Sequence, residues 1–232
     1  MRIGVTLPSF RNDLAALEAA QAAEEAGVHG VFCFDHLWPM GQPDRPALSL
    51  LPTLAAVACS TSRIRLGPLV ARVGLLPDAV LRESLLSLSL LAGDRLLVGI
   101  GTGDSKSADE HERTGLVFLG PADRQESLEQ LCLRLTEAGI ESWVGAGSAA
   151  TNRAARAAGI TLNFWGIGPD GLAEAARHGP VTWGGPIPGS AAEAAETLQR
   201  LEEAGAGWVV WGWPSSLDKV VEAAGAAGVA LA

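Results

Sequence analysis

Short apolar runs alternate with helical patterns along the whole chain, eight times in succession. The patterns between the apolar runs are rich in Ala, Leu and Glu, and several end in a glycine just before the next run. We predict strands at residues 3–7, 30–34, 64–71, 95–100, 141–144, 160–165, 181–183 and 207–211. We predict helices at residues 13–26, 46–60, 77–91, 121–138, 148–158, 169–177, 190–204 and 215–224. Such strict alternation is typical of parallel strands that are covered by helices.

Eight strand–helix units predict a (β/α)8 TIM barrel that forms a single domain over residues 1–232. The length fits, since about 200 residues is the lower limit for this fold. The main alternative is a doubly wound open sheet, which usually carries a glycine-rich turn after its first strand. Here the first predicted strand runs into Leu7–Pro8–Ser9–Phe10, without a glycine, and this favours the barrel.

Charge and cysteine content exclude several classes of partner. The formal net charge is −9, whereas nucleic acids and anionic membranes both select basic surfaces. Cys33, Cys59 and Cys132 are scattered without metal-ligand spacing, so we expect no metal site and three buried or half-buried thiols in a reducing compartment. The first residues read as a strand rather than a signal peptide. We therefore expect a cytoplasmic protein that binds a small molecule.

Glycines and tryptophans are concentrated where the predicted strands end. In a barrel these ends meet at one mouth, where active sites form. The segments Gly101–Thr102–Gly103 and Gly145–Ala146–Gly147–Ser148 would let backbone amides approach a ligand closely. Indole rings near the same mouth would supply broad apolar walls; they belong to Trp38, Trp165, Trp183, Trp211 and Trp213. This combination suits a flat aromatic cofactor that carries a phosphate.

The dyad Asp35–His36 directly follows the second predicted strand. A histidine at a strand end can exchange a proton near neutral pH, or it can simply cap the following turn. Adjacent residues of a strand point to opposite faces, so the two side chains should not pair directly. One of them is then expected to orient the loop.

Three further features are open to two interpretations each. The turn Gly145–Ser148 opens a predicted helix and is either an anion site with Ser148 as N-cap or an ordinary strand-to-helix turn. Arg72 either meets an anion or is a solvated residue at a strand end. His111 lies in the longest irregular stretch, residues 102–120, and is expected in a solvated loop.

Several motifs together carry a resemblance to a known family. They are IGVTLP at residues 3–8, FDHLW at 34–38, IRLGPLV at 64–70, the long segment 75–104, WVGAGS at 143–148, VTWGG at 181–185 and GWVVWGWP at 207–214. With these motifs the chain resembles the bacterial luciferase-like family of flavin- and deazaflavin-dependent oxidoreductases. The segment from the third to the fourth strand is the most specific part.

The resemblance implies a barrel that binds coenzyme F420 or FMN at its mouth, with F420 slightly favoured because His36 lies in a DHLW context. It implies hydride transfer or monooxygenation of a small organic substrate, with His36 as a catalytic residue and Asp35 as its neighbour. It also implies a non-prolyl cis peptide at Leu69–Val70 that faces the cofactor ring, and a phosphate-side loop at Gly145–Ser148. The remaining cofactor contacts are expected from Trp38, Gly101, Thr102 and Gly103.

The chain departs from the family pattern after the seventh predicted strand. A long insertion usually follows there, and here only Gly184 to Gly189 is present. Less cover over the mouth leaves an alternative, a non-catalytic protein of the same fold that binds a flavin or deazaflavin. A further alternative is an unrelated barrel, such as an isomerase or lyase, that binds a sugar phosphate.

The third predicted helix carries a wider apolar arc than one core-facing stripe requires. Its members are Val80, Leu81, Leu85, Leu86, Leu88, Leu90 and Leu91. We expect a homodimer that uses this helix. The alternative is a helix that is simply well buried in the coat of the barrel.

Overall fold

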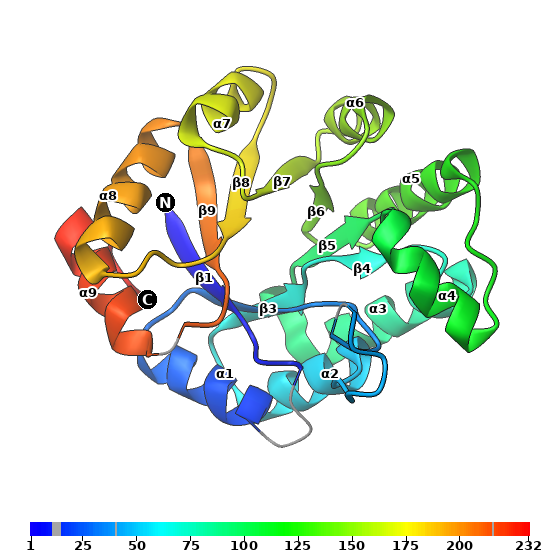
Figure 1. Cartoon of the computed structure of the whole chain (residues 1–232), viewed down its shortest axis with the longest axis horizontal. Coiled ribbons are helices and arrows are strands. Elements are labelled where there is room, and N and C mark those ends of the chain that lie inside the picture. The colour runs from blue at the N-terminus through cyan, green and yellow to red at the C-terminus, as the bar shows by residue number, and fades with distance from the viewer. Residues whose placement is uncertain (11–14, 40, 215) are drawn as a thin grey trace.

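The computed structural model describes residues 1–10, 15–39, 41–214 and 216–232. Its nine parallel strands form one sheet in the order β3-β2-β1-β9-β8-β7-β6-β5-β4, curled into a barrel (Figure 1). The strands are β1 (Arg2–Thr6), β2 (Gly30–Cys33), β3 (Arg65–Pro68), β4 (Ala71–Arg72), β5 (Val98–Gly101), β6 (Ser142–Gly145), β7 (Thr161–Trp165), β8 (Val181–Gly185) and β9 (Ala206–Trp211). This confirms the predicted TIM barrel.

The two ends of the sheet are consecutive pieces of one stretch of chain. β3 and β4 are separated only by Leu69 and Val70, which are joined by a cis peptide bond. The sequence predicted one continuous strand over 64–71, whereas β3 pairs with β2 and β4 pairs with β5. The backbone N–H of Leu97 donates to the carbonyl of Leu66 over 3.0 Å, which links β3 to the segment before β5 and closes the ring.

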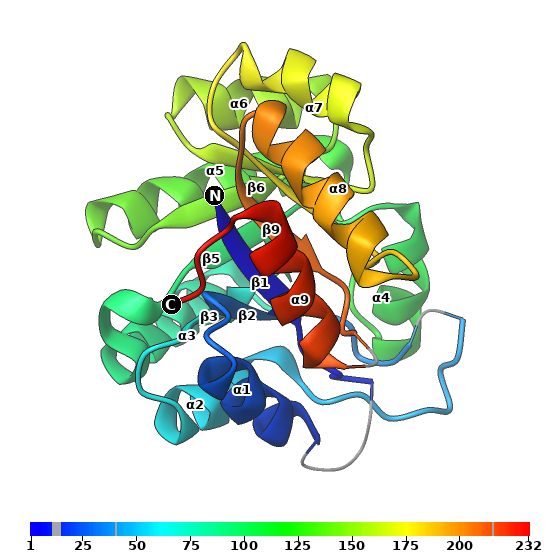
Figure 2. The ribbon, with the colours of Figure 1, turned by 90° about the vertical axis from the view of Figure 1, so that its left-hand side faces the viewer.

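Helices cover the outside of the barrel. The helices are α1 (Ala15–Glu25), α2 (Leu50–Ser60), α3 (Asp78–Ala92), α4 (Ala108–Thr114), α5 (Pro121–Glu137), α6 (Ala149–Ala157), α7 (Pro169–Ala176), α8 (Ala191–Glu203) and α9 (Leu217–Ala227). Figure 2 shows this cover for α8 and α9, which pass in front of β1 and β9. Helices pack against most of the strands, whereas α4 contacts the 3-10 turn that precedes it. The predicted starts at residues 13 and 215 lie outside the described residues, and α2 begins four residues later than predicted.

The segment 102–120 is not the open loop that the sequence predicted. A 3-10 turn at Ser105–Ser107 leads into α4, and Gly115 ends the helix in the left-handed conformation at φ 72°. Because glycine adopts this conformation at little cost, it is a common helix stop. His111 is buried, stacks edge-on against Phe118 at 5.0 Å and is not solvated. The short length of α4 hid it, since one or two turns give no hydrophobic period.

Aromatic side chains form a cluster in the interior of the barrel. Phe32, Trp143 and Trp208 are buried with ring centroids 5.3–5.9 Å apart. Glycine makes room for them, because a Cβ added at Gly30 would lie 2.9 Å from the Trp208 ring. These rings fill the barrel below the strand ends, so the space that remains lies at the mouth.

The cysteines are free, and two of them match the prediction. Cys33 and Cys132 are buried, and burial raises the pKa of each thiol to about 12, so both are inert. Cys59 is exposed on α2, which corrects the expectation that all three would be buried or half-buried. Across the described residues, no helix combines the length and the apolar character that a membrane crossing requires.

Candidate active site

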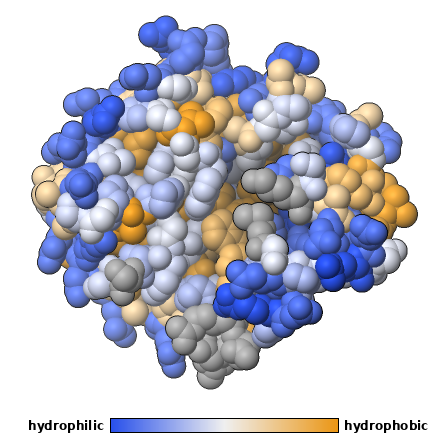
Figure 3. All heavy atoms as spheres, viewed as in Figure 1, coloured by the Kyte–Doolittle hydropathy of each residue, from blue (hydrophilic) through white to orange (hydrophobic). Residues whose placement is uncertain are grey.

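A cavity of about 520 Å³ opens at the C-terminal ends of the strands, a size that is usual for a small-molecule site. Ten of the twelve predicted site residues line it: Asp35, His36, Leu69, Val70, Gly101, Thr102, Gly103, Gly145, Ala146 and Gly147. Trp38 and Ser148 do not belong to its lining. The other lining residues are Phe10, Phe34, Arg72, Asp104, Ser107, Asn163 and Trp165. Of these, the sequence pointed to Trp165 as an apolar wall of the mouth and to Arg72 as one of two alternatives, an anion contact. In the space-filling view, apolar atoms reach the surface near the centre of the molecule, between polar rims (Figure 3).

Val70 forms one wall of the cavity, immediately after the cis peptide bond that the resemblance led us to expect. Its side chain lies against two glycines on neighbouring strands. A Cβ at Gly101 would overlap Val70 Cγ2, and a Cβ at Gly145 would lie 3.3 Å from Val70 Cγ1. Gly101 is therefore required for Val70 to occupy its place, whereas a side chain at position 145 would make a tight contact with it.

The backbone of residues 102 and 103 is held by an arginine from α5. Nη1 of Arg124 donates to the carbonyl of Thr102 over 2.8 Å and to that of Gly103 over 3.1 Å. The same guanidinium lies over the Phe118 ring, 4.3 Å from its centroid. Gly103 has φ 66°, which a side chain would disfavour. The turn after β5 is thus fixed by α5 and not free.

The turn at Gly145–Ser148 begins α6 as predicted, and Ser148 is its N-cap. The Ser148 hydroxyl accepts from the backbone N–H of Thr151 over 3.1 Å, which explains why this side chain is turned away from the cavity. The N–H of Ala146 donates to the Asn163 carbonyl, and that of Gly147 donates to Oδ1 of Asn152 over 3.0 Å. A phosphate at this turn would use the amides that follow Gly147, or would displace Asn152.

Asp35 and His36 do not pair with each other, as predicted. Oδ2 of Asp35 accepts from the backbone N–H of Arg72 over 2.8 Å, which ties the end of β2 to β4. Burial raises the pKa of Asp35, although this hydrogen bond and the charge of Arg72 act in the opposite direction. Asp35 therefore fixes the loop, and His36 is left with its ring at the cavity.

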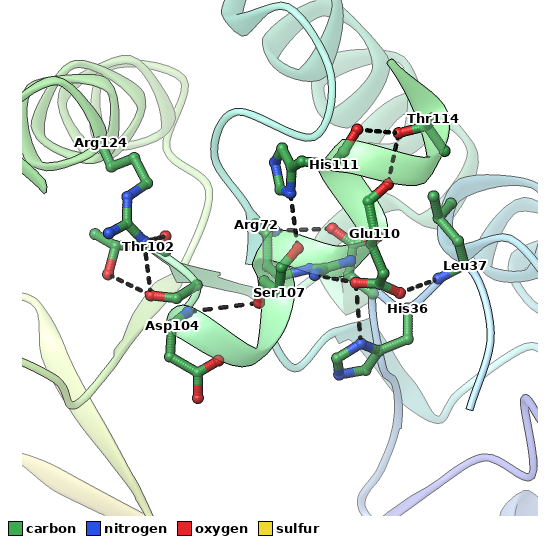
Figure 4. A network of polar contacts seen from close by, with 12 residues as sticks. His36, Leu37, Arg72, Thr102, Asp104, Ser107, Glu110, His111, Thr114 and Arg124 are labelled. Carbon is green, nitrogen blue, oxygen red and sulfur yellow. Dashed lines mark hydrogen bonds and ion pairs between the residues drawn. The ribbon is translucent and has the colours of Figure 1, made fainter. Parts of the chain in front are cut away.

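His36 contacts a carboxylate that the sequence did not point to (Figure 4). Its Nδ1 lies 3.4 Å from Oε2 of Glu110, which is buried on α4. Oε1 of Glu110 accepts from the backbone N–H of Leu37 over 2.8 Å, and Oε2 also pairs with Nη1 of Arg72. Arg72 is buried, which excludes the solvated interpretation.

These partners keep Glu110 ionised. Burial raises the pKa of this carboxyl, but the hydrogen bond from His36 and the charge of Arg72 outweigh burial and bring the pKa to about 2. Glu110 thus carries a negative charge at every pH at which the protein would work. The clue in the sequence is the segment ADEHERTG, which has acidic residues in its first turn and a glycine stop.

Tryptophan contributes less to the mouth than predicted. Trp183 and Trp211 are buried in the core, edge-on to each other at 5.3 Å, so they cannot form walls of the cavity. Trp165 does line it and packs edge-on against Phe34 at 5.5 Å. Trp213 lines a second, more open cavity of about 640 Å³. Among the residues that the structure describes, no group of three metal-ligating side chains is close enough to hold an ion.

The second cavity adjoins the first and is mostly apolar. Phe10, Phe34 and Trp165 line both spaces, so a partition of aromatic rings separates them. The rest of the second cavity comes from the ends of β1 and β9, from the short connection after β8 and from the connection between β2 and α2. These residues are Thr6, Leu7, Pro8, Arg45, Pro186, Ile187, Gly212 and Trp213. The site thus has two neighbouring cavities: the first contains His36 in its lining, and the second lies on the other side of the aromatic rings.

In a closed parallel barrel, enzyme active sites for small molecules form at the C-terminal ends of the strands, and here the cis peptide and His36 lie at that mouth. The chain belongs to the luciferase-like monooxygenase family, whose model matches residues 1–210. It is 38% identical over 84 residues to an F420-dependent glucose-6-phosphate dehydrogenase of Beutenbergia cavernae, a match that covers 36% of this chain and 25% of that protein. It is 36% identical over 107 residues to an F420-dependent hydroxymycolic acid dehydrogenase of Mycobacterium tuberculosis, covering 44% and 29%. The matched segments thus span between a quarter and a third of these relatives.

The fold is shared with solved structures of much lower sequence identity. An F420-dependent secondary alcohol dehydrogenase in complex with an F420-acetone adduct superposes with a TM-score of 0.77 at 13% identity, over 97% of this chain and 98% of that chain. At this identity the likeness establishes the barrel fold alone.

Proposed function

We propose that this chain is an F420-dependent oxidoreductase that transfers a hydride between the cofactor and a carbon atom of a small organic alcohol or carbonyl compound. The observation that carries the proposal is His36, which lines the cavity beside Val70 and has one ring nitrogen directed at a buried carboxylate. The F420-dependent relatives support F420 over FMN.

The residues of the cavity fit a planar ring with polar edges. Gly101 and Gly145 make room for the side chain of Val70, which presents an apolar surface to a ring in the cavity. Nε and Nη2 of Arg72 are buried and have no hydrogen-bond partner among the described residues, although Arg72 lines the cavity. Unpaired buried donors are costly, and a ring carbonyl or nitrogen would satisfy them. Arg72, Val70, Gly101 and Gly145 would therefore hold the ring, and the bound deazaflavin would accept or supply the hydride.

In alcohol oxidation the substrate loses a hydride from carbon and a proton from oxygen. His36 would take the hydroxyl proton on the nitrogen that does not face Glu110, and would return it in the reverse direction. Phe10, Phe34 and Trp165 border the place where substrate would enter, and they would exclude water from it. The apolar second cavity would take the body of the substrate.

The experiment that tests the proposal titrates the purified protein separately with F420 and with FMN and follows cofactor fluorescence. We expect saturable binding of F420 and weaker binding of FMN. Reduction of bound F420 by small secondary alcohols, followed by its visible absorbance, is the expected activity. Failure to bind either cofactor at saturating concentration would refute the proposal.

The short connection between β8 and α8 favours a second candidate, a protein that binds the cofactor without turnover. Only residues 186–190 join these two elements, so little of the chain extends over the mouth on that side. Tight binding of F420 without reduction by any alcohol or carbonyl partner tested would support this candidate over the first.

We further propose that the chain works as a homodimer in the cytoplasm. α3 is in part a core helix, because Leu81, Leu85 and Leu88 are buried. On its other face Val80, Leu90 and Leu91 are exposed, and Leu90 is 87% accessible. An open groove between α2 and α3 is lined by Leu51, Pro52, Ala55, Val80, Leu88 and Leu91 among others. An apolar surface of this kind suits a second copy of the chain.

A further inference from the structure

Glu110 makes contacts with three hydrogen-bond donors, each from a different residue. Its Oε1 accepts from the backbone N–H of Leu37, and its Oε2 faces both Nη1 of Arg72 and Nδ1 of His36 (Figure 4). Leu37 and His36 are neighbours in the loop after β2, and Arg72 ends β4. The carboxylate of Glu110 therefore connects α4 to the side chain of His36, the proposed proton acceptor, and to the backbone of the next residue, Leu37.

The chemistry of this contact fixes which nitrogen of His36 carries the proton. An ionised carboxylate has only acceptors, so a neutral imidazole beside it must present an N–H. His36 Nδ1 must then be the protonated nitrogen, and Nε2 on the opposite side of the ring is left with a free lone pair. Arg72 keeps the carboxylate ionised, because both side chains are only 5% exposed and the positive charge has no competing solvent.

We propose that Glu110 is a positioning residue for His36. Glu110 holds the imidazole ring of His36 in the Nδ1–H tautomer, so that Nε2 of His36 is the proton acceptor in the cavity. The role in catalysis rests on the proposed function, whereas the tautomer itself is a property of the protein alone. By the same argument α4 is part of the site, although its seven residues are too few to show a periodic pattern in the sequence.

The other histidines of the chain provide internal references. His29 Nδ1 accepts from the backbone N–H of Ile3 over 3.1 Å, so His29 must be the Nε2–H tautomer. His111 Nδ1 lies 2.9 Å from the carbonyl of Ser107, which can only accept, so His111 must be the Nδ1–H tautomer. With four histidines in all, each ring can be assigned in one spectrum.

The test is a long-range 15N–1H correlation spectrum of the protein without cofactor, recorded at about pH 8.5, where an ordinary imidazole is neutral. We expect His36 to show the pattern of His111, with the Nδ1–H form in excess by about tenfold or more, as a hydrogen bond to a charged acceptor allows. Finding wild-type His36 with the Nε2–H pattern of His29 would overturn the proposal without any variant.

Variants then show that Glu110 is the cause. Glu110→Ala removes the acceptor, and Glu110→Asp keeps the negative charge near Arg72 but is one methylene too short to reach Nδ1. In both, we expect the Nδ1–H excess of His36 to be lost while the patterns of His29 and His111 stay unchanged. Glu112→Ala is the matched control, because Glu112 is exposed on the same helix.

Circular dichroism and thermal unfolding identify any variant that does not fold, and Glu110→Asp keeps the test decisive if Glu110→Ala fails to fold. If His36 stays in the Nδ1–H form in a folded Glu110→Asp or Glu110→Ala protein, Glu110 does not position it. Because no cofactor is present in this experiment, a failure of F420 binding would refute the proposed function and leave this result standing.

Discussion

Arg72 and Glu110 form a buried ion pair between the end of β4 and α4, 38 residues apart in the chain. Breaking a buried pair is expensive because the remaining charge loses its counter-charge and has no water to replace it. Arg72→Met removes this positive charge and leaves Glu110 with its contacts to Leu37 and His36. We expect the variant to lower the free energy of unfolding by about 3–5 kcal/mol in urea denaturation.

Arg113→Met is the control for this variant. Arg113 pairs with Asp109 over 3.0 Å on the same helix, but both side chains are about half exposed. An exposed pair contributes about 0–1 kcal/mol, so we expect a change within that range. Equal losses for the two variants would show that the Arg72–Glu110 pair has no special importance for stability.

The low pKa of Glu110 gives stability a defined pH dependence. This pKa is about 2 in the folded protein against an ordinary value of 4.5, so the folded state favours the charged carboxylate. The resulting stabilisation, roughly 3 kcal/mol, is fully present above about pH 4.5 and is lost as the pH falls towards 2. Asp35, whose pKa is raised by burial, acts in the opposite sense.

Urea unfolding of the wild type and of Glu110→Gln, each at about pH 5 and about pH 3, isolates the contribution of Glu110 to the pH dependence of the free energy of unfolding. We expect the wild type to lose more stability between these two pH values than the variant, which has no carboxyl to protonate. A variant as pH-sensitive as the wild type would mean that other carboxyls account for the acid lability.

Val70 requires glycine at position 101, because a Cβ there would overlap its side chain. We expect Gly101→Ala to push Val70 into the cavity and to weaken F420 binding by roughly tenfold, with a stability loss of about 1–3 kcal/mol. Gly225→Ala on α9 is the control, since a Cβ there meets nothing within 4 Å. Unchanged F420 affinity in Gly101→Ala would show that the ring does not lie against Val70.

His36→Ala tests the proposed proton transfer. We expect the fold and F420 binding to persist while reduction of the cofactor by substrate slows by about 10²–10⁴-fold, the usual contribution of a general base. His178→Ala, which changes an exposed histidine, should leave the rate unchanged. An unchanged rate in His36→Ala would remove His36 from the mechanism.

Leu90→Glu tests the proposed dimer. A charge in the centre of an apolar interface is costly to bury, so we expect the variant to be monomeric where the wild type is dimeric by light scattering at micromolar concentration. Leu133→Glu is the control, because Leu133 is exposed on α5 at 50%. A monomeric wild type would refute the dimer directly.

The barrel could be predicted from the sequence because each strand is a continuous apolar run that is followed by a helix pattern. The lining of the cavity by Gly101–Gly103 and Gly145–Gly147 also follows from their places at strand ends. Position along a strand fixes which residues reach the mouth, but not which way a side chain turns. Ser148 is one example, since its hydroxyl caps α6 instead of facing the cavity.

Contacts that depend on distant segments could not be predicted. Glu110 belongs to a helix of seven residues, too short for a periodic pattern, and its partners His36 and Arg72 lie 74 and 38 residues away. The burial of Trp183 and Trp211 was missed for a related reason, because the sequence places them near strand ends without showing that they pack on each other.

The most direct test of the account is a crystal structure of the protein soaked with F420. We predict that the deazaflavin ring lies in the cavity against Val70, between the glycines of β5 and β6, with Nε2 of His36 open towards the substrate side. Cofactor density elsewhere on the protein, or a ring that leaves this cavity empty, would contradict it.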